Sequence, residues 1–171
     1  MLPTRTRKAQ GFTLVEILIV VVILGILAAI VIPQFTSASE NAKASSLTSQ
    51  LQTIRSQLEL YQINHGGDYP DFSSNWDQFT ELTNEAGNTS GTPTPTLGPY
   101  MQKPPANPFG GLTAVNQVTG TTAVTGTSGT HGWGYNTDTG EIKAILPDTV
   151  TATEAQGLGL DIVNDVVVTA S

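Results

Sequence analysis

The first pattern in the chain is a long run of apolar positions. From Phe12 to Ile32 only Thr13 and Glu16 carry polar side chains, and this segment is 21 residues long. A helix rises about 1.5 Å per residue, so the segment could cross the roughly 30 Å hydrocarbon core of a bilayer. The pattern predicts a helix that is apolar on every side and needs lipid or other apolar helices around it.

The second pattern is an apolar stripe at helical spacing. Its members recur at alternating intervals of four and three residues, which places them on one helix face; they are Leu47, Leu51, Ile54, Leu58 and Tyr61. Asn64-His65-Gly66-Gly67 then predicts the helix end, with His65 as a solvated cap residue. Gly25 and Pro33 weaken the helix, and we expect a tolerated kink rather than a break. One stem should run from Phe12 to Asn64.

Short apolar segments separated by glycine, proline and threonine make up the rest of the chain. Ser74-Asn75-Trp76-Asp77 predicts a capping box that opens a short helix. Trp76, Phe79 and Leu82 then share one face of this helix, with Trp76 as a core residue, and Gly87 can end it.

Four later segments are candidate strands: Leu112–Val118, Trp133–Asn136, Glu141–Leu146 and Asp161–Val168. The second and third flank Thr137-Asp138-Thr139-Gly140, a sequence typical of hairpin turns, so they should pair antiparallel. The Thr/Gly-rich residues 119–132 should form a loop. The predicted fold class is α+β, a long N-terminal helix packed on a small antiparallel sheet.

Charge is distributed unevenly along the chain. Arg5, Arg7 and Lys8 precede the apolar segment, whereas the residues beyond Gly11 carry four basic and fourteen acidic side chains, a formal charge of −10. Basic residues before the apolar segment favour a cytoplasmic N-terminus. The acidic remainder lacks the basic face of a nucleic-acid binder, so we expect no nucleic-acid partner.

Catalytic motifs are not apparent in the sequence. The two histidines, His65 and His131, lie in Gly-rich stretches, and the chain has neither cysteine nor a Walker or zinc motif. The acidic residues are scattered, so paired-carboxylate chemistry cannot be argued. We therefore expect a protein that is not an enzyme.

Three interpretations compete for the N-terminus: an uncut membrane anchor, a secretory signal peptide, and a leader that is cut before the apolar segment. The apolar segment is longer than a signal peptide requires. Glu16 favours the third interpretation. A cut between Gly11 and Phe12 would create an ammonium at Phe12, four residues from Glu16, and pairing the two charges lowers the cost of burying either one.

The residues Lys8-Ala9-Gln10-Gly11-Phe12-Thr13-Leu14-Val15-Glu16 resemble the processing site of type IV pilins and type II secretion pseudopilins. The resemblance extends through the apolar run to Phe35, and it makes Arg5, Arg7 and Lys8 the basic part of a leader. It implies that a prepilin peptidase cuts after Gly11 and that the Phe12 amine is methylated. It also implies that Glu16 meets the Phe12 amine of an adjacent subunit during assembly.

A second, looser resemblance lies between Gly98 and Gly111. This stretch is similar to the Gly-Pro-Tyr segment of major pseudopilins of type II secretion, with Asn107 in place of Asp and Phe109 in place of Trp. Tyr100 and Phe109 should anchor it on the core. The missing cysteines agree with this branch, because adhesive pilins usually carry a disulfide.

The same resemblance suggests a calcium ion. Asn136, Asp138 and Asp148 could supply oxygen ligands, although the first two are also ordinary turn residues. We expect no obligatory cofactor.

The expected organisation is a leader at residues 1–11, a transmembrane and polymerisation helix at 12–33, an amphipathic helix at 34–65 and a periplasmic globular domain at 66–171. The expected function is a structural subunit of a type II secretion pseudopilus in the bacterial inner membrane. Its partners would be copies of itself, other pseudopilins, the prepilin peptidase, the inner-membrane platform of the machine and lipid. Two alternatives stay open: a type IV pilin or minor pilin of a surface filament, and a monomeric membrane-anchored binding module.

Overall fold

The computed structural model describes residues 11–73 and 75–168. Its longest element is α1 (Leu14–Asn64), a helix that is continuous through Gly25 and Pro33, as expected. The chain divides into two compact units, Met1–Ser39 and Glu40–Ser171, so that the boundary falls inside α1. The predicted stem is confirmed, apart from a start two residues later than Phe12.

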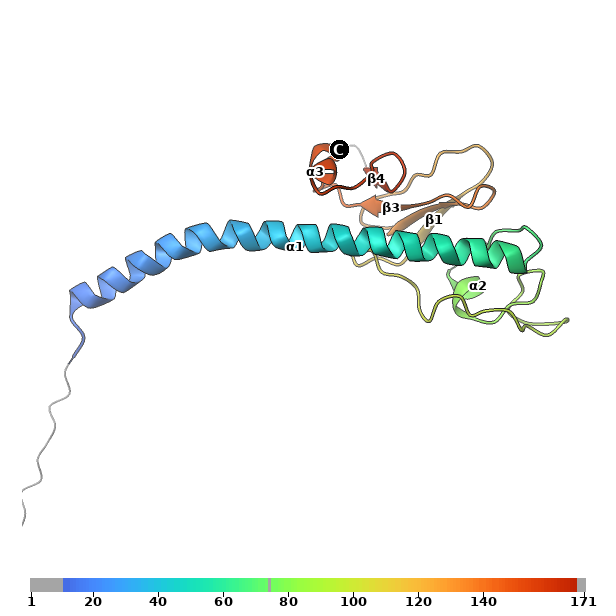
Figure 1. Ribbon diagram of the computed structural model, residues 1–171, viewed down its shortest axis with the longest axis horizontal. Helices are drawn as coiled ribbons and strands as arrows, with labels where there is room; N and C mark the ends of the chain where they lie inside the picture. The colour runs from blue at the N-terminus through green and yellow to red at the C-terminus, as the bar shows by residue number, and fades with distance from the viewer. Residues whose placement is uncertain (1–10, 74, 169–171) are drawn as a thin grey trace, which may run out of the picture. The chain divides into compact units, whose positions relative to one another are not determined.

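The amphipathic half of α1 supplies one side of the core of the second unit. Every member of the predicted stripe is buried, and Ala44 extends the stripe by one position. The stripe joins one cluster with strand residues such as Trp133, Tyr135 and Ala144. In the view of Figure 1 the strands lie on one side of this half of α1, and α2 (Asp77–Thr80) lies on the other.

The sheet has four strands in the order β1-β2-β3-β4. They are β1 (Val115–Val118), β2 (Trp133–Asn136), β3 (Ile142–Leu146) and β4 (Val166–Val168). Only β2 and β3 pair antiparallel, with Tyr135 opposite Ile142, whereas β1 pairs with β2 and β3 pairs with β4 in parallel.

The predicted α+β fold class is confirmed, with a long helix packed on a small sheet. The prediction that the sheet is antiparallel was wrong, because the sheet is mixed. The physical reason is the length of two connections. In a parallel pair the chain must return to the end of the sheet at which the first strand began, which takes a dozen or more residues. The connections 119–132 and 147–165 are long enough for this. The second connection contains α3 (Ala152–Gly157).

Strand boundaries follow the prediction most closely at the hairpin. β2 has the predicted bounds, and β3 begins one residue late, at Ile142 rather than Glu141. Gly140 adopts φ 69° in the turn, and a Cβ there would collide with the ring of Tyr69. The other two strands are shorter than predicted, since residues 112–114 are irregular and residues 161–165 form a turn.

Both short helices depart from the prediction. The residue that caps α2 is Trp76, which makes no side-chain cap bond, and Ser74 lies outside the described residues. The helix ends at Thr80, before Leu82 can join its buried face, and Leu82 is 45% exposed. In α3, which was not predicted, Thr151 and Glu154 form a capping box, and the T-x-x-E spacing was a usable signal for it.

The loop that resembles major pseudopilins is fixed at three points. Tyr100 is buried and Phe109 packs against the core, as predicted. Asn107 is also buried: its amide nitrogen donates to the carbonyls of Gly132 (2.8 Å) and Ile145 (2.9 Å), and its Oδ1 accepts from the Phe109 N–H. A carboxylate cannot donate to these carbonyls, so the amide of Asn107 provides bonds that the Asp of the resembling sequences could not.

His65 was expected in solvent, and this prediction was wrong. Its side chain is 3% exposed and its ring stacks on Tyr61 with centroids 3.6 Å apart. Nδ1 donates to the carbonyl of Tyr61 (2.8 Å), and Nε2 lies 2.9 Å from Oγ1 of Thr83. The flanking glycines mark the helix end, but they do not reveal that the loop at Thr83 covers the ring.

Candidate functional site

The start of α1 is closed by a reciprocal set of hydrogen bonds between Thr13 and Glu16. The Thr13 N–H and hydroxyl both donate to Oε2 of Glu16, at 2.9 and 2.8 Å. The Glu16 N–H donates in return to Oγ1 of Thr13, at 3.2 Å. This is the pattern of a capping box, and it also puts negative charge at the positive end of the helix. In the single chain, Glu16 is therefore a helix-capping residue.

The predicted cleavage site immediately precedes this capping box. Gly11 and Phe12 lie outside α1, and Phe12 is 83% exposed. A Cβ added to Gly11 would meet no atom within 4 Å, so the fold itself does not require glycine there. Any requirement for glycine at this position must come from a molecule that acts on the chain.

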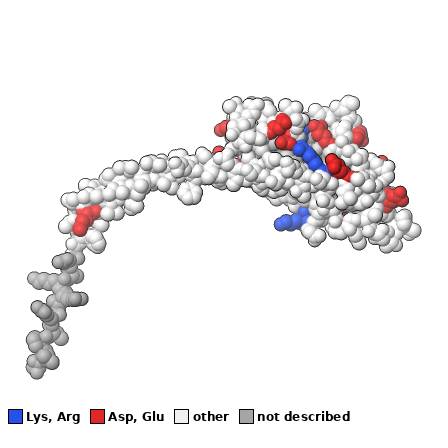
Figure 2. Space-filling model, in the orientation of Figure 1, with Lys and Arg blue, Asp and Glu red and all other residues white. Residues whose placement is uncertain are grey.

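The apolar half of α1 buries none of its side chains. Its large hydrophobic residues are exposed from Phe12 to Phe35. The helix is long and apolar enough to cross a membrane, since it contains an 18-residue stretch with a mean hydropathy of 3.3. On the face drawn in Figure 2, charged side chains occur near the start of α1 and over the second unit, with a long uncharged stretch of helix between them. Such a surface needs an apolar environment.

The other predicted site residues of the N-terminus are three basic residues, a glycine and a proline. Arg5, Arg7 and Lys8 lie outside the described residues. Gly25 and Pro33 are both inside α1, and a Cβ at Gly25 would meet no atom within 4 Å. Glycine is therefore not required there by packing within the single chain.

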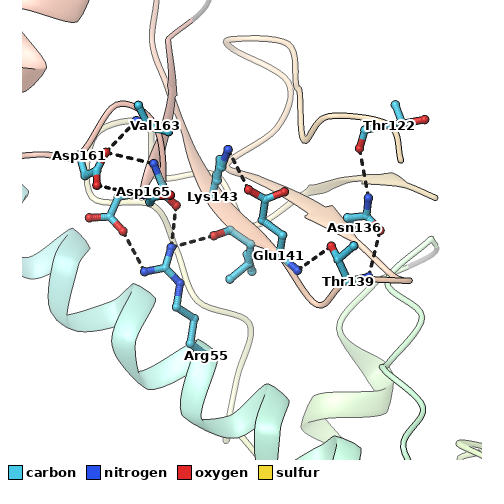
Figure 3. Close-up of polar contacts among 11 residues, drawn as sticks. Arg55, Thr122, Asn136, Thr139, Glu141, Lys143, Asp161, Val163 and Asp165 are labelled. Carbon is cyan, nitrogen blue, oxygen red and sulfur yellow. Dashed lines mark hydrogen bonds and ion pairs between the residues drawn. The ribbon is translucent and has the colours of Figure 1, made fainter. Parts of the chain in front are cut away.

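The three calcium candidates lie near loop 119–132. Asn136 is buried; its Nδ2 donates to the carbonyls of Gly120 (3.0 Å) and Thr122 (3.1 Å), and its Oδ1 accepts the backbone N–H groups of residues 138 and 139 (Figure 3). Asp138 accepts from the Gly120 N–H. At the other end of the loop, the backbone N–H of Asp148 donates to Oγ of Ser128 (3.0 Å).

These contacts do not favour calcium. The Asn136 Oδ1 already accepts two backbone N–H groups of the turn, so it has no lone pair directed at an ion. Within residues 11–73 and 75–168, no three His, Cys, Asp or Glu side chains group closely enough to hold a metal. Calcium binding by Asn136, Asp138 and Asp148 stays a prediction that the geometry does not support.

A cavity of about 480 Å³ opens beside the end of α1. Its lining includes four carboxylates, those of Asp68, Asp71, Glu85 and Asp138. Burial raises the pKa of the Tyr61 phenol, which therefore stays protonated and donates to Gln78 at 3.0 Å. The contacts of His65 are to a carbonyl and a threonine, so the described residues do not give it the partners of a catalytic triad.

Two important residues were missed by the sequence argument. Thr13 could have been identified from the T-x-x-E spacing that it shares with Glu16. Arg55 could not, because its guanidinium contacts residues 142, 164 and 165, far away in the sequence.

Comparison with known proteins agrees with the features of this N-terminus. Residues 6–32 match the family described as "Prokaryotic N-terminal methylation motif". The chain is 34% identical over 107 residues to "Type II secretion system core protein G" of Pseudomonas aeruginosa, covering 61% of this chain and 70% of that protein.

Two further relatives match over different lengths of the chain. The protein of the same name from Escherichia coli K12 is 32% identical over 115 residues, with 61% and 70% covered. "Type IV wide pilus major component PilA4" of Thermus thermophilus is 42% identical over 59 residues, which is 34% of this chain and 45% of that protein. No solved structure is a significant match.

Proposed function

The chain belongs to the family of type II secretion system core protein G, and from this premise we propose that it is a filament subunit which is cut after Gly11 and polymerises through α1. The observation that carries the proposal is the combination of two features: similarity to a core protein G over 70% of that protein's length, and an apolar helix half that no described residue covers. The function is that of a structural subunit of a type II secretion pseudopilus.

The first step is insertion into the inner membrane. The apolar half of α1 spans the bilayer, and the basic residues Arg5, Arg7 and Lys8 stay on the cytoplasmic side. The acidic second unit then lies in the periplasm. This orientation is supported by the charge asymmetry around the apolar segment, which has three basic residues before it and a formal charge of −10 beyond Gly11.

The second step is processing by a prepilin peptidase. Hydrolysis of the bond between Gly11 and Phe12 leaves an ammonium on Phe12, and methylation of this amine keeps its positive charge. Both residues are exposed and precede the first turn of α1, so a protease can reach the bond without unwinding the helix. The absence of a Cβ at Gly11 would let the peptidase approach the backbone closely.

The third step is assembly, in which Glu16 has the central role. The capping box holds the carboxylate beside the start of the helix, close in sequence to the new ammonium. We propose that the ammonium of a neighbouring Phe12 becomes a further partner of this carboxylate among packed apolar stems. Burying two opposite charges together costs far less than burying one of them alone.

The test of processing is the intact mass and the N-terminal peptide of the protein isolated from its native membrane. A chain that begins at N-methylated Phe12 supports the proposal. A chain that still begins at Met1, or that begins after the apolar segment near Glu40, contradicts it and favours a membrane anchor or a secreted domain.

The match to a wide-pilus component favours one second candidate, a type IV pilin of a surface filament. Deletion of the gene separates the two functions: loss of protein export indicates a pseudopilin, whereas loss of surface fibres or twitching indicates a pilin. The smaller coverage of the PilA4 match makes the pseudopilin the better supported function.

A further inference from the structure

The C-terminal part of the second unit is contacted by a positively charged side chain of α1, that of Arg55. Arg55 extends from α1, and its Nη1 donates to Oδ1 of Asp165 at 2.8 Å. Its Nη2 donates to the carbonyls of Asn164 (2.8 Å) and Ile142 (3.1 Å). Figure 3 shows the guanidinium approached by oxygen atoms from β3 and from the turn before β4.

That turn, residues 161–165, is organised by Asp161. Its Oδ1 accepts the N–H groups of Val163 (2.8 Å) and Asn164 (3.1 Å), and its Oδ2 accepts the side-chain amide of Asn164 (2.7 Å). The hydrogen bond from the Asn164 side chain, the two backbone N–H groups and Arg55 together lower the pKa of Asp161. The carboxylate therefore stays charged while it shapes the turn.

The position of this turn makes its attachment important. β4 begins directly after it, has three residues, and pairs in parallel with β3 at the edge of the sheet. The connection from β3 to β4 is long, so closing it costs conformational entropy. Arg55 bonds both to β3, through the carbonyl of Ile142, and to the turn, through Asn164 and Asp165. It therefore ties the last strand to the rest of the unit.

The atoms around the guanidinium are a carboxylate oxygen and two backbone carbonyl oxygens. These are the oxygen types that hold calcium in proteins. A guanidinium offers the same positive charge in a rigid planar fork of N–H donors, which suits several oxygens at once. The side chain of Asp165 is 19% exposed and that of Arg55 is 36% exposed, so water screens the pair only in part.

We propose that Arg55 holds the C-terminal turn in the way that a bound divalent cation would, so that this chain folds and keeps β4 in place without calcium. The inference goes beyond the filament function, because it concerns the stability of the second unit. Its tests do not depend on cleavage or assembly, so failure of one proposal leaves the other standing.

The experiment measures thermal unfolding of the full chain in detergent micelles, using fluorescence of Trp76 and Trp133. With calcium chloride or with a chelator, the Tm should be the same. Arg55→Met should lower the Tm by roughly 4–8 °C, because it removes three charge-assisted hydrogen bonds. It should also speed amide hydrogen exchange selectively in residues 161–168.

The matched control is Lys103→Met. It removes the same charge from an exposed side chain that has no ion pair among the described residues, and it should change neither Tm nor exchange. If Arg55→Met does not fold, Asp165→Asn keeps the shape of the site and should give a smaller Tm loss with the same localised exchange.

Two results would overturn the proposal. One is a saturable rise in the Tm of the unaltered chain with calcium chloride, or a fall with chelator. The other is exchange in residues 161–168 that is as slow in Arg55→Met, or in Asp165→Asn, as in Lys103→Met.

Discussion

The two halves of α1 share one helical backbone and have opposite surroundings. In the first half every large apolar side chain from Phe12 to Phe35 is exposed, and no described residue covers it. In the second half one face is buried from Ala44 to Tyr61, against the aromatic and aliphatic residues of the sheet. α1 is continuous from Leu14 to Asn64, although it contains Pro33, a residue type that would end most helices.

This difference separates two sources of stability. The second half contributes to folding of the single chain, because its stripe is removed from water by the same molecule. The first half gains no comparable stability in the single chain, because its apolar surface is removed from water only when lipid or other apolar helices cover it. Substitutions in the first half should therefore change assembly, whereas substitutions in the second half should change folding.

The largest effect is expected for Glu16→Val. Without the carboxylate, the ammonium of a neighbouring Phe12 would be left unpaired among apolar stems, so assembly should fall by about 100-fold or more. Sedimentation of sheared filaments measures assembly, and alkaline extraction of membranes measures insertion, which should be unchanged.

Glu40→Val is the matched control, since Glu40 is an exposed glutamate of the same helix. It should assemble normally. Normal assembly of Glu16→Val would show that Glu16 has no pairing role in the filament.

The next largest effect is expected when one of two leucines of α1 is replaced by alanine. Leu51 is fully buried, so Leu51→Ala should lower the free energy of unfolding of the second unit by about 2–5 kcal/mol. Leu24→Ala makes the same change on the exposed half and should leave that free energy unaltered. Urea unfolding of the full chain in detergent, followed by tryptophan fluorescence, measures both. Equal losses would show that the two halves are not independent.

A smaller effect is expected at the capping box. Thr13→Val keeps the side-chain shape and removes the hydroxyl that accepts from Glu16, which should destabilise the first turn by about 1 kcal/mol. Faster amide exchange at residues 16 and 17 would report it. Thr53→Val is the control, because the Thr53 hydroxyl only donates back to the carbonyl of Ser49 inside the helix. A similar change in exchange around Thr53 would contradict a specific capping role.

The smallest effect is expected when the pH is lowered through the pKa of Asp71. The Ser73 N–H lowers the pKa of Asp71, burial partly opposes this, and the Gln117 amide reinforces it. A carboxyl with a lowered folded pKa stabilises the fold above the unfolded pKa, about 3.9, and loses that contribution as the pH falls through the folded value.

The Tm of the unaltered chain should therefore exceed that of Asp71→Asn above about pH 4, and the gap should close at lower pH. Helicity of the apolar half in detergent should not follow this change. A gap that stays constant down to the most acidic pH would rule out ionisation of Asp71 as its cause.

Local sequence patterns were sufficient to predict those elements whose structure depends on residues close together in the sequence. The stripe from Leu47 to Tyr61 and the glycines after Asn64 predicted α1 because helical contacts lie three and four residues apart. The turn before Gly140 predicted β2 and nearly all of β3 for the same reason. At the candidate site, the Thr13–Glu16 contact spans one helical turn, so it was available in the sequence although we did not identify it.

Distant contacts were the ones that could not be predicted. Asn107 bonds to residues 132 and 145, and Arg55 bonds to residues 142, 164 and 165. His65 is buried because Thr83 and Tyr100 come to lie beside it. Nothing within a few residues of these side chains indicates such partners.

The sequence by itself determined the apolar segment, the amphipathic stripe, the hairpin turn and the processing motif, because each depends on chemistry repeated over a few residues. The tertiary structure alone decided that the sheet is mixed, that His65 is buried and that Arg55 holds the last strand. Those outcomes depend on how long connections return the chain to the sheet. Many paths through the same connections satisfy the local rules, and only packing of the whole unit selects among them.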